Sequence, residues 1–197
     1  MLGALKPQFW WYLARSSGIV AWVLCTLAVL WGLLVASRMI PVRSAPKWLL
    51  DMHRFLGALA LASTAVHLLA LVADSYLRFA WAELFVPFAS TYEPGAVAWG
   101  VVALYLLVAV EATSLVMRFL PRRWWRVVHL SSFVAFAMVT VHAFLAGADA
   151  RNVYLVTVAS MFLGVLVFTS VVRVLAAVRG TRREPRGLAA TPTAPAQ

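Results

Sequence analysis

Apolar residues dominate five long segments of the chain, and shorter stretches rich in arginine, proline and acidic residues separate them. Each segment holds about twenty or more mostly apolar residues, the length that an α-helix needs to cross a bilayer. We therefore predict an all-α fold, an integral membrane helical bundle of five transmembrane helices. The predicted spans are approximately Ser17–Ala36, Met52–Ala73, Gly95–Met117, Val127–Ala146 and Val153–Ala176.

Three other segments are not predicted to span. In Ser37–Asp51 two prolines prevent a continuous helix. Asp74–Pro94 is too polar to cross, and its aromatic residues predict a short helix lying at the interface over one end of the bundle. Residues 179–197 are rich in Arg, Pro and Ala without apolar periodicity, which predicts a disordered tail. The expected organisation is one membrane domain over residues 1–178, followed by that tail.

The composition supports insertion in a lipid bilayer. Hydrophobic residues make up 63% of the 197 residues and charged residues 12%, whereas a soluble domain is about half apolar and a quarter charged. The net charge is +10, but the basic residues flank apolar spans, so membrane topology explains them better than nucleic-acid binding. The first apolar run lacks a small-residue cleavage site, and no cleavable signal peptide is expected.

The distribution of basic residues predicts the orientation of the spans. Thirteen of the 17 Lys and Arg residues fall in the first connection with the start of span two, the connection between spans three and four, and the end of span five with the tail. Because cytoplasmic loops carry the excess of Lys and Arg, we expect the N-terminus outside and the C-terminus in the cytoplasm. His53 and His129 then lie near the cytoplasm, and His67 and His142 lie near the outer face.

The four histidines of the chain are divided equally between two of the predicted spans. His53 and His67 are 14 residues apart, and His129 and His142 are 13 residues apart. On an α-helix these spacings correspond to roughly 20 Å, most of the ~30 Å hydrocarbon core. Two such helices side by side present two histidine pairs at matched depths, the arrangement that axial ligation of two haems requires.

Other interpretations of the histidines stay open. A histidine in a membrane helix often only bonds a neighbouring helix. A zinc site usually needs three or four converging ligands, which a separation of roughly 20 Å prevents within either helix. A straight helix would also point His129 and His142 about 140° apart, so that either the span is overwound or two haems sit at different azimuths.

Cys25 is the single cysteine and no CxxCH motif is present, so any haem is held non-covalently.

Arginines near the histidines are candidate ligands for haem propionates. Arg54 and Arg126 adjoin the cytoplasmic pair and could form charge-assisted hydrogen bonds, in addition to their role in topology. Arg15 and Arg78 are weaker candidates at the outer face. Glu111 lies within span three, and the sequence assigns it no role.

The segments YLARSSG, HRFLGALALASTAVH and DSYLRFAWAELFVPFASTYEP, with paired histidines on alternate helices, resemble the ferric reductase-like transmembrane domains of bacterial proteins, ferric reductases and NADPH oxidases. The resemblance implies two b-type haems, one held by His53 and His129 and one by His67 and His142. It further implies a bacterial plasma-membrane protein that transfers electrons from a cytoplasmic donor to an outer-face acceptor.

Members of this family often continue into domains that bind FAD and NAD(P)H. Here about 20 residues of tail follow the last span, without a GxGxxG motif. We therefore expect flavin and nicotinamide only through a partner, a cytoplasmic flavoprotein reductase or another donor, and whether the chain alone is an oxidoreductase stays open. No side chain stands out as a catalytic acid, base or nucleophile. The alternatives are a haem-binding subunit of a multi-component reductase, such as a methionine sulfoxide reductase system, and a non-redox membrane protein.

Overall fold

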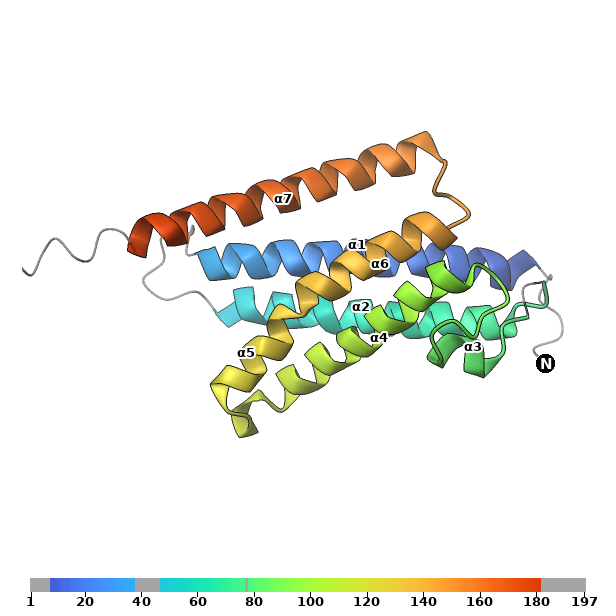
Figure 1. Ribbon diagram of the computed structural model, residues 1–197, viewed down its shortest axis with the longest axis horizontal. Coiled ribbons are helices and arrows are strands. Elements are labelled where there is room, and N and C mark those ends of the chain that lie inside the picture. Colours follow the sequence, from blue (N-terminus) through green and yellow to red (C-terminus); the bar gives the residue numbers. More distant parts are fainter. Residues whose placement is uncertain (1–7, 38–46, 77, 182–197) are drawn as a thin grey trace, which may run out of the picture.

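The computed structural model describes residues 8–37, 47–76 and 78–181, which form an all-α bundle without strands among them (Figure 1). Five helical segments of this part are long and apolar enough to cross a membrane, as the hydropathy pattern predicts. In chain order the helices are α1 Gln8–Ser37, α2 Lys47–Ala73, α3 Trp81–Phe85, α4 Pro94–Leu115, the 3₁₀ helix Met117–Phe119, α5 Arg122–Leu130, α6 Ser132–Ala146 and α7 Val153–Thr181.

Four of the five spans extend further as helix than predicted, whereas α4 ends at Leu115, two residues before the predicted Met117. Helix α1 starts at Gln8, well before the predicted Ser17, and α5 starts at Arg122 rather than at Val127. Helix α7 continues to Thr181, so the first three residues of the predicted tail are helical. Hydropathy marks only the window that fits a bilayer, whereas backbone hydrogen bonding extends a helix beyond it. Most of the predicted first connection, with Arg38 and Arg43, and the tail from residue 182 lie outside the described residues.

Consecutive spans run in opposite directions and pack in two pairs. Helix α1 packs along α2, and α4 packs along α6, while contacts of α1 with α6 join the two pairs. Helix α7 lies at the edge of the bundle and contacts α1 (Figure 1). We call the end that holds α3 and the start of α1 the α3 end, and the opposite end, where α5 begins, the α5 end.

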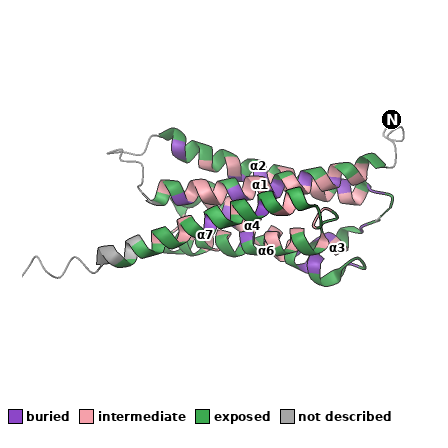
Figure 2. Cartoon of the chain, turned by 90° about the horizontal axis from the view of Figure 1, so that it is seen from above, coloured by how far each residue is buried: buried purple, intermediate pink, exposed green. Residues whose placement is uncertain are grey.

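Large apolar side chains cover much of the outside of the bundle. Buried residues concentrate between the helices, whereas outward surfaces are exposed (Figure 2). Leu69 on α2, Leu145 on α6 and Phe168 on α7 are 57%, 60% and 68% exposed. A water-soluble monomer rarely exposes apolar area so extensively, and such a surface suits contact with lipid.

Polar side chains inside the bundle bond between helices. The indole Nε1 of Trp22 on α1 donates to Thr140 Oγ1 on α6 at 3.0 Å. The hydroxyl of Ser63 on α2 donates to the carbonyl oxygen of Ser17 on α1 at 3.1 Å. Because lipid offers no hydrogen-bond partner, such bonds satisfy groups that would otherwise be costly to bury, and they fix how α1 faces its neighbours.

The connection between α2 and α4 contains the predicted short helix, but only as the five residues of α3. Phe79 and Leu84 of this connection are buried against Val97 and Val101 at the start of α4. The carboxylate of Glu83 accepts hydrogen bonds from the backbone N–H groups at residues 80 and 91, at 2.9 and 3.1 Å. These bonds to the charged form lower the pKa of Glu83 below its ordinary value and close the connection into a compact cover.

Candidate functional site

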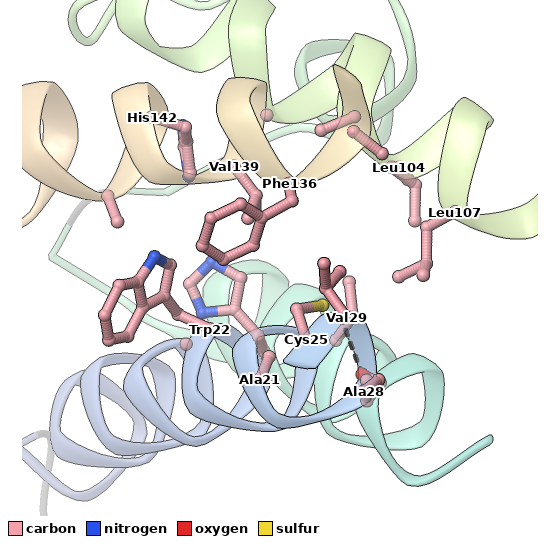
Figure 3. A pocket seen from close by; sticks show the side chains of 18 of the residues that line it. Ala21, Trp22, Cys25, Ala28, Val29, Leu104, Leu107, Phe136, Val139 and His142 are labelled. Carbon is pink, nitrogen blue, oxygen red and sulfur yellow. Dashed lines mark hydrogen bonds between the residues drawn. The ribbon is translucent and has the colours of Figure 1, made fainter. Parts of the chain in front are cut away.

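A cavity of about 840 Å³ lies between α1, α2, α4, α5 and α6, with residues of α7 also in its lining, and all four histidines line it. Its walls are mainly apolar: Cys25 and Val29 of α1 point toward Phe136 and Val139 of α6, with Leu107 of α4 at the side (Figure 3). The interiors of proteins are normally packed without voids of this size. The volume lies in the upper part of the range for ligand-binding sites, and apolar walls with a few polar groups are typical of them.

The structure brings the histidines together in two pairs across this cavity. The imidazole rings of His53 on α2 and His129 on α5 have centroids 5.9 Å apart, with planes inclined by 70°. His67 on α2 and His142 on α6 line the same cavity and interact electrostatically. A metal ion bound by two opposed imidazoles at about 2 Å from each nitrogen needs centroids roughly 6 Å apart. The spacing of the first pair therefore suits two axial ligands of one iron.

In three of the four histidines, the ring nitrogen Nδ1 is hydrogen-bonded to a backbone carbonyl of a neighbouring helix. Nδ1 lies 3.1 Å from the carbonyl oxygen of Ala28 for His53, 2.7 Å from that of Ala14 for His67 and 2.8 Å from that of Ala96 for His142. A carbonyl oxygen only accepts, so the hydrogen must reside on Nδ1, and Nε2 keeps its lone pair. Metal-binding histidines typically show such a bond on the nitrogen away from the metal.

Nε2 is the nitrogen left for a ligand. In the part of the chain that the structure describes, no residue forms a hydrogen bond with Nε2 of any of the four histidines. No group of three or more His, Cys, Asp and Glu converges among the described residues, so a zinc-type cluster is not formed there. The donor set thus consists of imidazole pairs, which fits axial ligation of haem iron.

Glycines permit the close approach of these rings to the helix backbone. A Cβ atom at Gly18 would lie 3.0 Å from the His67 ring, one at Gly32 would lie 3.0 Å from the His53 ring, and one at Gly100 would lie 2.8 Å from the His142 ring. Each glycine follows the bonded carbonyl by four residues, so that the motif is Ala-x-x-x-Gly in all three cases. The side chain at that position would otherwise cover the carbonyl.

Sequence reasoning missed these glycines, although a signal was available. Gly18 and Gly32 are 14 residues apart, the same spacing as the two histidines of the adjacent antiparallel helix α2. Small residues four apart are common wherever membrane helices pack closely, so the motif has little specificity without the histidine spacing beside it. Gly57, in contrast, lies against Glu111 rather than against a histidine.

The helix that carries His129 and His142 is interrupted between the two histidines. Helix α5 ends at Leu130 and α6 begins at Ser132, and the hydroxyl of Ser131 bonds the carbonyl oxygen of Val128 at 2.6 Å. The sequence suggested overwinding or different azimuths for a straight span, whereas this span is not straight, and both histidines line the cavity on either side of Ser131. Serine side chains that bond the preceding turn often bend membrane helices.

His129 is held differently from the other three histidines. Its Nδ1 lies 3.4 Å from the hydroxyl oxygen of Ser114 on α4, and its ring stacks on Trp125 one turn earlier, with centroids 4.9 Å apart. A hydroxyl can donate or accept, so Ser114 orients this ring without fixing which nitrogen carries the hydrogen.

The candidate arginines separate into two groups. Arg54 and Arg15 line the cavity at its α5 and α3 ends, and Arg15 forms an ion pair with Asp149. Arg126 and Arg78 are exposed and do not line the cavity. Arg173 on α7, which the sequence suggested only as a topology signal, does line it.

Comparison of the chain with protein-family models, curated proteins and solved structures finds no match.

Proposed function

We propose that this protein transfers electrons across a bilayer by means of two b-type haems. His53 and His129 hold one haem at the α5 end, and His67 and His142 hold the other at the α3 end. The observation that carries the proposal is the anchoring of Nδ1 of three histidines to backbone carbonyls, which directs an unprotonated Nε2 to the ligand. Bound haem supplies the one-electron chemistry.

The residues of the chain hold, orient and isolate the cofactors. The anchored rings would hold the iron of each haem, and the apolar walls would limit the access of water and so tune its redox potential. Arg54 at the α5 end and Arg15 at the α3 end are the cavity-lining cations that would bind propionates. Because Arg126 lies outside the cavity lining, its proposed role is docking of a partner instead.

The donor is proposed to be a cytoplasmic flavoprotein that docks at the α5 end. Arg118, Arg122, Arg123 and Arg126 are exposed there. A surface of one charge sign accelerates encounter with an oppositely charged partner. The acceptor would approach at the α3 end, on the outer side of a bacterial plasma membrane, where the Asp74–Pro94 segment controls access. A ferric chelate is the first acceptor to test.

Transfer across the bilayer can be measured in liposomes that enclose a membrane-impermeant reductant. The wild-type protein should reduce an external impermeant ferric chelate. His67→Ala should still accept electrons at the α5-end haem but should reduce the chelate at least tenfold more slowly. Leu69→Ala, which removes an exposed side chain two residues further along α2, should retain the wild-type rate. Equal rates for wild type and His67→Ala would contradict the proposal.

A further inference from the structure

Glu111 is a carboxyl group within the membrane-spanning part of the bundle that the proposed function does not use. It lines the cavity from α4, and its carboxylate reaches α2 at Gly57, where any Cβ atom would collide with it. The carboxylate forms no hydrogen bond or ion pair with any residue that the structure describes. Carboxyl groups inside a membrane are costly and are typically functional.

The position of Glu111 relates it to the histidine pair at the α5 end. Ser114 contacts His129, and Glu111 lies three residues before Ser114 on α4. Gly57 follows His53 by four residues on α2. Three and four residues correspond to about 4.5 and 6 Å along a helix. The carboxyl group therefore lies about one turn from this pair, on the side toward the middle of the bundle.

Few other ionisable groups face this half of the cavity. The thiol of Cys25 on the opposite wall interacts electrostatically with Glu111. No further acidic side chain lines this half among the described residues. The remaining titratable or charged groups that line it are His53 and Arg54 of α2, His129 of α5 and Arg173 of α7.

We propose, on the basis of the proposed function, that Glu111 is the proton acceptor that compensates charge when the α5-end haem is reduced. One electron from a one-electron reductant converts ferric to ferrous haem, and one proton from water binds the carboxylate of Glu111, so the net charge of the cavity is unchanged. In an apolar cavity an uncompensated charge is strongly unfavourable. Linkage is reciprocal, so a proton on Glu111 must also favour reduction of that haem.

Spectroelectrochemical titration of the purified haem-loaded protein between pH 6 and 8.5 tests this inference. The midpoint potential of the α5-end haem should fall as pH rises, because ionised Glu111 stabilises the ferric form. A tenfold change in proton concentration shifts a one-electron couple by at most about 59 mV. In Glu111→Gln the potential of this haem should not change with pH, while the α3-end haem behaves as in wild type.

Two further variants complete the test. Glu111→Asp keeps a carboxyl group and should retain the pH dependence. Glu93→Gln removes a carboxylate at the opposite end of α4, outside the cavity lining, and should behave as wild type. If haem is bound and the pH dependence persists in Glu111→Gln, or is missing in wild type, the inference is wrong while the proposed function stands. If no haem binds, the proposed function itself fails.

Discussion

Nδ1 of His67 on α2 lies 2.7 Å from the carbonyl oxygen of Ala14 on α1, and the absence of a side chain at Gly18 makes this approach possible. The bond determines which nitrogen of His67 carries the hydrogen, and it holds the ring against the wall of the cavity. The same relationship recurs for His53 and for His142. Binding of a metal ion requires that Nε2 make no bond to the protein. A purely structural role for the histidines has no such requirement.

Replacement of Gly100 by Ala should displace His142. The added Cβ would lie 2.8 Å from the ring, too close without a shift of the ring or of α6. Overpacking of this kind costs about 1–3 kcal/mol, and we expect loss of the α3-end haem with retention of the other. Haem content per chain, from absorption of the purified protein, measures the effect.

Gly164→Ala is the matched control, because nothing lies within 4 Å of a Cβ at this position of α7. This variant should bind as much haem as wild type. An unchanged haem content in Gly100→Ala would show that the glycine is not needed to seat His142.

The break at Ser131 should be needed to align His129 with His142. Insertion of one alanine directly after Ser131 turns the residues that follow by about 100° on a helix. We expect the α3-end haem to be lost while the α5-end haem, bound ahead of the insertion, remains. One alanine inserted after Gly187, beyond both ligands and all cavity-lining residues in the sequence, is the control and should leave the haem spectrum unchanged. If both insertions leave the spectrum unchanged, the break has no role in alignment.

The connection between α2 and α4, which covers the α3 end of the bundle, should loosen in acid. Because the hydrogen bonds to Glu83 lower its pKa in the folded protein, their stabilising contribution is present at neutral pH. That contribution is lost as pH falls through the lowered pKa, below the ordinary value of 4.5. Amide exchange at Ala80 and Thr91, corrected for its intrinsic pH dependence, should accelerate there.

Glu83→Gln should exchange quickly at these two amides at neutral pH and show no such transition. Protection that is the same in Glu83→Gln and in wild type at all pH values would mean that the carboxylate does not hold the cover.

The orientation of the bundle is testable with reporter fusions. Thirteen of the 17 basic residues lie at the α5 end or in the segments joined to it, which predicts that this end is cytoplasmic. A fusion at Gln197 should be active only as a cytoplasmic reporter, and one within Ala82–Thr91 only as a periplasmic reporter. The reverse pattern would invert the proposed direction of electron flow.

Hydropathy was enough to predict five spans, because a bilayer selects about twenty apolar residues whatever their order. It could not predict the ends of α1, α5 and α7, since residues outside the hydrocarbon core are not selected in this way. The break at Ser131 was missed because serine is common inside membrane helices without bending them.

The matched depths of the histidines followed from their spacing alone. Their anchoring did not, because it depends on which backbone carbonyl a packed helix leaves uncovered. Arg126 was placed beside the cavity by its proximity in sequence to His129, yet it lies on α5 pointing to the exposed surface, whereas Arg173 reaches the cavity from a distant helix. The depth of a residue in the membrane can be derived from its position in the chain. The direction in which its side chain points around the helix depends on how the helices pack.

The haem content of the purified protein tests the central claim most directly. A dithionite-minus-air difference spectrum of the wild type should show low-spin b-type haem, two per chain, because both axial positions of each iron are filled. His53→Ala or His129→Ala should remove the α5-end haem, and His67→Ala or His142→Ala should remove the α3-end haem, so that each variant retains one. A wild-type protein without haem after expression with ample haem supply, or four variants that all keep two haems per chain, would contradict the account.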